Sequence, residues 1–398
     1  MKKKFGKHGY PRRSANRFSL FVDGENYFPE ILSSIRNARW YVAIELYYVE
    51  PGEVYDLFEA ALLEKANQNI FVFLMFDYFG SLKLFQSDIG KLNHPFIYFK
   101  FYNRFSLRKL KNNIFRDHRK IFIVDSKIAY TGGTGITDEF YSVSGRTSPW
   151  HEVTLKVEGE CVSDWVDLFF RVFPGNYKKS SIIQSIRKEP AKPAVIRNGF
   201  SQVGRLTYSK RFYFKDILRS TLRQIGEARR EIYIVTAYFL PTWRFRRALK
   251  KAVKRGVSVK ILLPGETTDH PSVLLMGRRY YHALLSHGVR IYEYQEGFNH
   301  SKIYICDDWV SIGSCNLDRW SLQKNLEANQ EVFDPEFTAE VVSLVKGDLK
   351  KSKEIQLSSW TKRSFFNRFF ERFWIGLLAL AESLFSRWKR RTKGKGGR

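Results

Sequence analysis

Two copies of one short pattern contain the residues of this sequence best suited to chemistry. The spacing is H-x-K-x4-D, and its copies are His118, Lys120 and Asp125, then His300, Lys302 and Asp307. On a β-strand, residues two apart share a face, so each histidine is expected to point the same way as its lysine. The aspartate lies seven residues after the histidine and has the opposite parity. A specific pattern found twice in one chain indicates a duplicated unit.

Two histidine-lysine pairs brought face to face could transfer a phosphoryl group. A neutral imidazole can attack phosphorus while a protonated imidazole across the site donates to the leaving oxygen. The ordinary pKa of histidine, about 6.5, suits both roles. Lys120 and Lys302 would neutralise the phosphoryl oxygens as charge develops. This chemistry needs no metal ion and no cofactor, and no acidic cluster suited to Mg²⁺ or Ca²⁺ stands out, so we expect neither.

Each imidazole needs a group that orients it. The parity of Asp125 and Asp307 places them away from the histidines, where they would tie the hairpin together. Glu152 and Glu327 are better candidates, because they follow their histidines by 34 and 27 residues, far enough for the next strand to return beside the first. The alternative is that both are solvated surface carboxylates. The candidate catalytic residues are His118, Lys120, Asp125, Glu152, His300, Lys302, Asp307 and Glu327.

Small residues follow each motif and favour binding of an anion. They are Gly132-Gly133-Thr134-Gly135 in the first half and Gly313-Ser314-Cys315-Asn316 in the second. Small side chains let backbone N–H groups approach a phosphate closely, although such a cluster is often only a tight turn. The candidate phosphate-binding residues are Lys120, Lys302, Ser314 and Asn316.

The elements around both motifs follow the order β-α-β-α-β. The expected strands are Phe18–Val22, Trp40–Tyr48 and Ile70–Phe76, then Leu206–Tyr208, Ile232–Tyr238 and Val257–Leu263. The expected helices are Tyr27–Ala38 and Val54–Asn67, then Phe212–Ala228 and Trp243–Lys254. Asn69 aligns with Gly256, and both residue types tolerate the left-handed conformation that ends a helix. The pattern predicts an α/β fold made of two similar domains.

The predicted organisation has five segments. They are a basic tail (1–17), a first domain (18–185), a linker (186–200), a second domain (201–358) and a C-terminal amphipathic helix with a basic tail (359–398).

The charge is concentrated at the two ends of the chain. The net charge is +27, of which residues 1–17 and 361–398 together supply +16. Basic ends suit an anionic surface, either nucleic acid or acidic lipid, although charge can also serve solubility alone. No apolar run of ~20 residues is present, so we expect neither a signal peptide nor a membrane span. The three cysteines have no metal-type spacing, which favours buried thiols in a reducing compartment.

The doubled motif resembles the signature of the phospholipase D superfamily. The block Gly313–Asn329 is similar to the one that follows the second motif in bacterial cardiolipin synthases. Three further segments resemble the short B-type form of that family, and the likeness covers about residues 18–345. These segments are Asp23–Pro29, Pro149–Glu152 and Ala237–Pro241.

The resemblance implies two phospholipase D-like α-β-α sandwich domains with the active site at their pseudo-two-fold interface. It implies a phosphatidyltransferase that works through a phosphohistidine. Phosphatidylglycerol would be the substrate, with phosphatidylglycerol or phosphatidylethanolamine as the second lipid, and cardiolipin the product. By analogy His118 would be the nucleophile and His300 the acid and then the base. The sequence departs from the family at Gly135, where Asn is usual, at Glu152, where Asp is usual, and in a hairpin at Asp307 that is one residue short.

The C-terminal stretch 365–388 suggests how the chain meets lipid. Its large apolar residues fall on one helical stripe, but the apolar run is too short to span a bilayer. An in-plane interfacial helix followed by a basic tail fits better, and a helix packed on the protein itself is the alternative. We therefore expect a peripheral protein on the cytoplasmic face of the bacterial inner membrane. Its partners would be an anionic phospholipid surface and phosphatidylglycerol, with no nucleic acid expected.

Three other functions fit the same residues. A nuclease of the superfamily would use the same pairs on a DNA phosphodiester. A hydrolytic phospholipase D would differ only in using water as acceptor. A catalytically inactive lipid-binding scaffold is the third. The sequence leaves the acceptor and the oligomeric state open.

Overall fold

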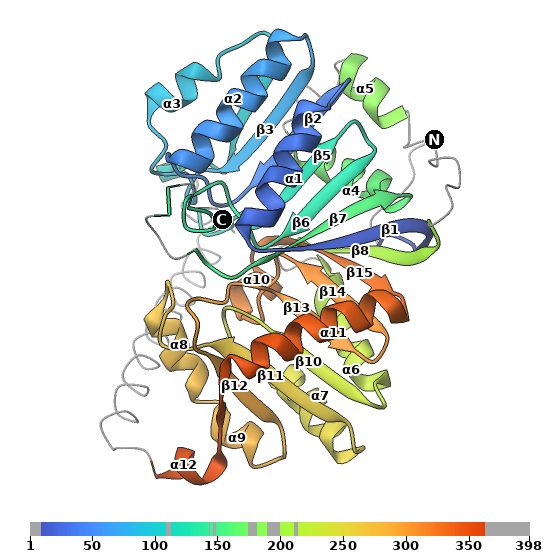
Figure 1. Ribbon diagram of the computed structural model, residues 1–398, viewed down its shortest axis with the longest axis vertical. Coiled ribbons are helices and arrows are strands. Elements are labelled where there is room, and N and C mark those ends of the chain that lie inside the picture. The colour runs from blue at the N-terminus through green and yellow to red at the C-terminus, as the bar shows by residue number, and fades with distance from the viewer. Residues whose placement is uncertain are drawn as a thin grey trace, which may run out of the picture.

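One continuous β-sheet organises the protein. The structure is a computed structural model that describes residues 9–108, 113–142, 144–145, 149–173, 181–188, 200–210 and 214–362. Its 16-stranded sheet runs through two halves of the chain, which lie one above the other in Figure 1.

The strands follow the same order in both halves. The first half contributes β1 (Arg13–Val22), β7 (Val153–Gly159), β6 (Ile128–Gly132), β5 (Ile121–Val124), β2 (Tyr41–Leu46), β3 (Phe71–Asp77) and β4 (Ile97–Tyr102), in that spatial order. The second half contributes β8 (Gln202–Lys210), β15 (Leu326–Phe333), β14 (Trp309–Gly313), β13 (Ile303–Cys306), β10 (Glu231–Val235), β11 (Ser258–Pro264), β12 (Arg290–Tyr294) and an added edge strand β16 (Ser352–Ile355). A short strand β9 (Phe214–Lys215) pairs with β8. The expected α/β fold with a duplicated unit is confirmed.

The two halves join where β1 and β8 pair in antiparallel fashion. Asn16 is fully buried at this joint. Its amide donates to the carbonyls of Arg13 and Gln202, at 2.9 and 3.1 Å, and its oxygen accepts from the backbone N–H of Cys161. These bonds satisfy backbone groups at the irregular start of the pairing, where a buried group without a partner would be costly.

Helices cover both faces of the sheet. In the first half they are α1 (Gly24–Arg36), α2 (Glu53–Asn67), α3 (Gln86–Lys91), α4 (Cys161–Val172) and α5 (Ser181–Lys188). In the second half they are α6 (Asp216–Glu227), α7 (Trp243–Lys254), α8 (Pro271–Arg278), α9 (Tyr281–Leu285), α10 (Arg319–Gln323), α11 (Pro335–Lys350) and α12 (Leu357–Thr361).

The sequence of β2 is almost entirely apolar because the strand is buried on both faces. Val42 and Ile44 pack in the cluster that includes α1 and α2, whereas Tyr41 and Ala43 pack in the cluster that includes α4. A parallel strand buried on both faces needs apolar residues at consecutive positions. The strand therefore lies in the middle layer of an α-β-α sandwich.

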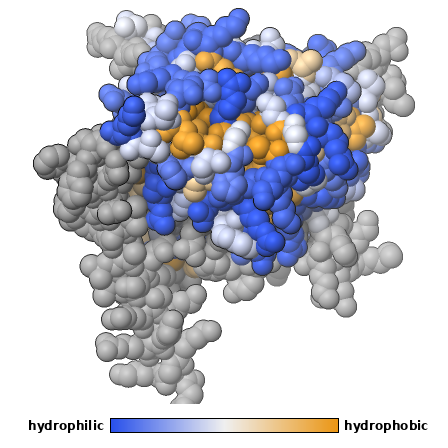
Figure 2. All heavy atoms as spheres, turned by 90° about the horizontal axis from the view of Figure 1, so that it is seen from below, coloured by the Kyte–Doolittle hydropathy of each residue, from blue (hydrophilic) through white to orange (hydrophobic). Residues whose placement is uncertain are grey.

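Hydrophilic residues cover most of the end of the molecule seen from below, around a hydrophobic strip in the middle of the view (Figure 2). Helix α7 has apolar side chains inside and hydrophilic side chains outside. Its buried residues are Phe245, Leu249 and Ala252, and most of its other residues are Lys or Arg. No helix within the described part of the chain has the length and apolar character needed to cross a bilayer.

The structure corrects the limits expected for three segments. Strand β1 begins at Arg13, so part of the expected 1–17 tail pairs with β8. Helix α5 extends to Lys188 because Ile183 and Ile186 are buried against the core, so the expected linker 186–200 begins within a helix. Helix α12 crosses residue 359 and buries Trp360 against Tyr281. The rest of the linker (189–199) and the expected amphipathic helix lie outside the described residues, and the division into domains stays a prediction.

The duplication also shows in backbone detail. Asn69 and Gly256 have φ angles of 62° and 88° where α2 and α7 end, as their alignment predicts. The second hairpin is shorter than the first, since Cys306 pairs with Trp309 while Val124 pairs with Ile128.

Candidate active site

Each histidine-lysine pair is held by the opposite half of the molecule. The pairs lie just before β5 and β13. The backbone N–H of His118 donates to the carbonyl of Leu326 at 3.0 Å, and that of His300 donates to the carbonyl of His151 at 2.8 Å. These crossed bonds bring the two motifs to one place at the joint between the halves.

The glutamates cross over in the same way. His118 Nδ1 lies 3.1 Å from Glu327 Oε2, and His300 Nδ1 lies 2.8 Å from Glu152 Oε2. Both carboxylates are fully buried. They are therefore not solvated surface groups, and each contacts the histidine of the other half, not the one that precedes it in the sequence. The expected pairing within each half is wrong. Glu152 lies immediately before β7 and Glu327 lies on β15, and these strands flank the β1–β8 pair that joins the two halves.

The two lysines have different surroundings. Lys120 Nζ donates to the carbonyl of His118 at 2.8 Å. Lys302 Nζ donates to the carbonyl of His300 and to Glu152 Oε2, the latter at 3.3 Å, and lies 2.7 Å from His300 Nδ1. The charge of Glu152 is therefore partly compensated by a cation.

Glu327 has neutral partners in place of a cation. Ser314 Oγ donates to its Oε2 at 2.5 Å. The position matching Ser314 in the first half is Gly133, where a Cβ would lie 1.9 Å from Glu152 Oε2. The two halves thus differ in how each carboxylate is neutralised.

Burial dominates the electrostatics of the site. It lowers the pKa of His118 and His300 well below the ordinary value, and the two lysines lower it further. Burial also lowers the pKa of Lys120 to about 7 and raises that of Glu327 to about 8. An anionic phosphodiester placed among these groups would favour their cationic forms. The site is therefore suited to receive a negative charge.

Both histidines open onto one cavity of about 570 Å³. Lys120 and Gly133 also line it, together with seven aromatic side chains, which are Tyr47, Tyr48, Phe79, Phe140, Trp150, Tyr238 and Phe298. A second cavity of about 460 Å³ shares Tyr47, His118, Tyr238 and His270 with the first, so the two are parts of one cleft. Such a cleft can hold a phosphate between two imidazoles and exclude much of the surrounding water.

Asp125 and Asp307, included among the candidate catalytic residues, do not face the histidines. The Asp125 carboxylate accepts the backbone N–H groups of Arg39, Trp40 and Tyr41 at 2.8 to 2.9 Å. Asp307 accepts three N–H groups in the same way at the start of β10. Each aspartate therefore ties the end of one strand to the beginning of its neighbour, as the parity of the motif indicates. Its role is to stabilise the fold.

Ser314 and Asn316 differ in their availability to a phosphate. The Ser314 hydroxyl is engaged by Glu327 and is a positioning group, which corrects its expected role. Asn316 is fully buried and lines the second cavity, and its Nδ2 has no hydrogen-bond partner. A buried donor without a partner fits an anion bound in the cleft. Gly135 cannot be Asn here, because a Cβ would lie 2.3 Å from the carbonyl oxygen of Tyr48.

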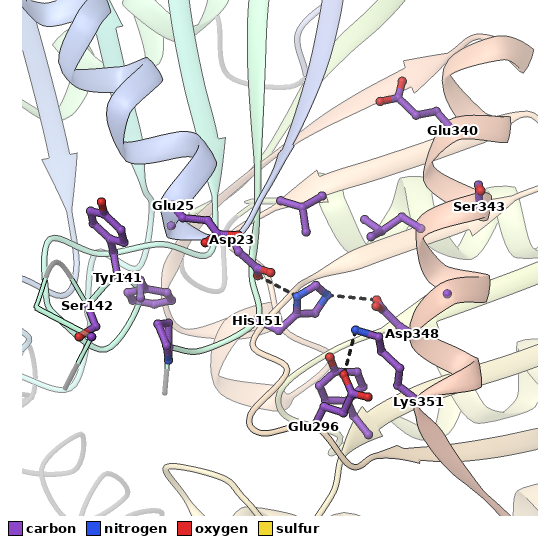
Figure 3. A pocket seen from close by; sticks show the side chains of 18 residues that line it. Asp23, Glu25, Tyr141, Ser142, His151, Glu296, Glu340, Ser343, Asp348 and Lys351 are labelled. Atoms are coloured by element: carbon purple, nitrogen blue, oxygen red, sulfur yellow. Dashed lines mark hydrogen bonds and ion pairs between the residues drawn. The ribbon is translucent and has the colours of Figure 1, made fainter. Parts of the chain in front are cut away.

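A charged bridge beside the site was not predicted from the sequence. His151 donates from both ring nitrogens, to Asp23 Oδ1 at 2.8 Å and to Asp348 Oδ2 at 3.2 Å, as Figure 3 shows. Burial lowers the pKa of His151, but the two carboxylates outweigh it and raise the pKa to about 10. Asp23 also accepts the backbone N–H of Glu152 at 3.1 Å. The bridge joins α1, α11 and the segment carrying Glu152.

A second missed feature is a buried ion network under the first motif. Arg119 alternates with His118 and Lys120 and points the other way, where it pairs with Asp117 at 2.9 Å and with Glu45. Arg116 pairs with Asp77. The unbroken run of ionisable residues along 116–120 was the available signal for this network.

Comparisons with known proteins identify the family of this chain. A family model described as "Cardiolipin synthase, PLD-like domain" matches residues 221–349, which include the second motif. The chain is 31% identical to cardiolipin synthase B of Salmonella typhi over 359 residues, 89% of this chain and 86% of that protein. It is 31% identical to cardiolipin synthase 2 of Bacillus anthracis over 88% of this chain and 68% of that protein. A crystal structure of phosphatidylserine synthase from Haemophilus influenzae Rd KW20 has a similar fold, with a TM-score of 0.68, 13% identity and coverage of 95% and 96%.

Proposed function

Since this chain belongs to the cardiolipin synthase family of the phospholipase D superfamily and is a phosphatidyltransferase, we propose that it converts two molecules of phosphatidylglycerol into cardiolipin and glycerol. Phosphatidylethanolamine is the alternative second lipid. The observation that carries the proposal is the crossed arrangement of the site. Two imidazoles open onto one cleft, each bonded at Nδ1 to a buried glutamate of the other half.

The first step forms a phosphohistidine. With its Nδ1–H donated to Glu327, His118 has a free electron pair at Nε2 that attacks the phosphorus of phosphatidylglycerol. The bond from phosphorus to the glycerol headgroup oxygen breaks. His300, whose cationic form the bound phosphodiester favours, donates its Nε2 proton to that oxygen and becomes neutral. Lys120, which lines the cavity, stabilises the charge on the phosphoryl oxygens, and the unpartnered Asn316 amide provides a further donor.

The difference between the two glutamates favours His118 as the nucleophile. Glu327 accepts a hydrogen bond from the Ser314 hydroxyl and not from a lysine. A positive charge on the phosphohistidine at His118 would draw Glu327 into its ionised form, and the charge of that carboxylate stabilises the cation. Glu152 is partly neutralised by Lys302, so it stabilises a cation on His300 less strongly. A less basic imidazole is the better proton donor.

The second step transfers the phosphatidyl group to an alcohol. His300, now neutral, takes the proton of the acceptor hydroxyl, whose oxygen attacks phosphorus and releases His118. An aromatic lining slows attack by water, which would give phosphatidic acid instead. The acceptor is therefore set by how completely lipid fills the cleft.

We place this reaction at the surface of an anionic membrane, on its cytoplasmic face, because both substrates are lipids and the chain carries a net charge of +27.

Product analysis tests the proposal. Purified protein is incubated with phosphatidylglycerol, with and without phosphatidylethanolamine, and the lipids are identified by mass spectrometry. Cardiolipin supports the synthase, and its absence from the His118→Ala variant ties it to this site. Phosphatidic acid as the sole product would show a hydrolase. Cleavage of DNA without any lipid product would show a nuclease.

A further inference from the structure

Large apolar side chains are exposed at one place on the protein. Among the described residues, eight such side chains are at least 37% exposed. Three of them line the two cavities of the cleft, and these are Phe79, Leu82 and Trp320. Four others lie in the connections that follow β3, β4 and β10, and these are Phe85, Phe105, Leu107 and Trp243. The eighth, Leu357, lies on α12. Exposed apolar groups gathered in this way mark an interaction surface more often than a free surface.

The sheet topology explains why these residues gather. Phe79, Leu82 and Phe85 follow β3, and Phe105 and Leu107 follow the parallel neighbour β4, so both segments emerge at the same edge of the sheet. Phe79 and Leu82 line the catalytic cavity.

The second half completes the rim. Trp243 follows β10 at the beginning of α7, and Tyr238, five residues earlier in the same connection, lines the catalytic cavity. Trp320 lines the adjoining cavity beside His118. Aromatic residues of both halves therefore border the entrance to one cleft.

The rim is also basic. Helix α7 contains six Lys and Arg residues and no acid. In the first half Arg104 and Arg108 flank the exposed Phe105 and Leu107. Three acidic residues line the cavity inside the rim, Glu50, Glu139 and Asp269, and Glu50 is paired with Lys83 at 2.8 Å. Aromatic and aliphatic side chains interspersed with cations match the headgroup region of an anionic bilayer.

We infer that this rim is a membrane-docking surface, in which Phe85, Phe105, Leu107 and Trp243 insert into an anionic bilayer and set the cleft against the lipid headgroups. The inference rests on the proposed function, because a cleft that takes both lipids from a bilayer must open toward it. It locates the main membrane contact in the two folded halves and not in the C-terminal tail alone.

The test uses the full-length protein with Phe85, Phe105, Leu107 and Trp243 all changed to Ser. None of the four lines either cavity of the cleft. Binding to vesicles of equal parts phosphatidylglycerol and phosphatidylcholine is measured by flotation. We expect the partition coefficient to fall by about tenfold for each inserted side chain removed, which corresponds to about 1.4 kcal/mol each. The matched control is Leu357→Ser, which removes an exposed apolar side chain beyond β16, at the opposite ends of the strands, and should leave binding unchanged.

A second readout separates docking from chemistry. Turnover of a short-chain phosphatidylglycerol below its micelle concentration should be the same in the four-fold variant as in the unmodified protein. An unmodified protein that binds vesicles but does not turn over this substrate would count against the proposed function and leave the docking result intact.

Two results would overturn the inference. One is vesicle binding by the four-fold variant within threefold of the unmodified protein. The other is a dimer that becomes a monomer in the variant while vesicle binding is kept, which would show that a second copy of the chain occupies the rim.

Discussion

Replacing Glu327 by Gln removes the carboxylate that can be ionised beside His118 when the imidazole becomes cationic, and it leaves the shape of the side chain almost unchanged. The carboxylate lies 3.1 Å from Nδ1 and is fully buried. At an effective dielectric constant of ~20, a charge at this distance stabilises a cationic imidazole by about 5 kcal/mol. The Gln oxygen can still accept the Nδ1–H bond, so part of the orienting effect remains.

We therefore expect kcat for phosphatidyl transfer to fall by about 10³-fold in Glu327→Gln, with a much smaller change in KM. Initial rates are measured on phosphatidylglycerol in detergent micelles, where docking to a bilayer does not limit the reaction. Thermal unfolding of the variant shows that the loss is not caused by unfolding.

The matched control is Glu331→Gln. Glu331 lies on the same strand and is also buried, but it pairs with Arg205 at 3.4 Å, away from the histidines. Its turnover per folded molecule should be normal. Wild-type turnover in Glu327→Gln, or an equal loss in both variants, would refute the role of Glu327 in positioning and stabilising His118.

Three other changes test separate parts of the site. Asp125→Asn should lower the free energy of unfolding by about 1–3 kcal/mol in chemical denaturation, because the partners of Asp125 are backbone N–H groups at the start of β2. Its kcat should stay normal, and a large loss of kcat in a stable variant would show a catalytic role. Asn316→Ala should lower kcat/KM about tenfold by removing a donor from the phosphate, and unchanged kinetics would exclude that contact. The pKa of His151 is raised to about 10 in the folded state, so its bridge to Asp23 and Asp348 stabilises the protein fully below pH ~6.5 and is lost as the pH rises through about 10. Thermal unfolding should show that the free energy of unfolding falls by up to about 5 kcal/mol over this range, and that this fall is absent in His151→Gln. The same fall in that variant would assign it to other groups.

Local pattern was enough to predict the repeated elements and the position of the aspartates. The parity of Asp125 relative to His118 separates them on a strand, and the structure places the carboxylate at the start of β2. These features depend on residues close together in the chain.

The crossing of the glutamates could not be predicted in this way. Glu327 is 209 residues from His118, and the two meet only because β1 pairs with β8 and joins the halves. The His151 bridge was missed for the same reason, since its partners lie 128 and 197 residues away. A residue that contacts groups so distant in sequence has no local pattern to mark it.

Direct capture of the covalent intermediate tests the central claim, that one site built from both halves uses His118 as nucleophile and His300 as acid and base. A phosphatidyl ester of p-nitrophenol is mixed with His300→Ala, because its leaving group departs without a donated proton. The reaction is stopped in alkali, and the peptides are mapped by mass spectrometry. We predict a burst of one equivalent of p-nitrophenol and a phosphatidyl group on the peptide that contains His118. A phosphatidyl group on His300 in the unmodified protein, or full turnover by His118→Ala, would contradict the account.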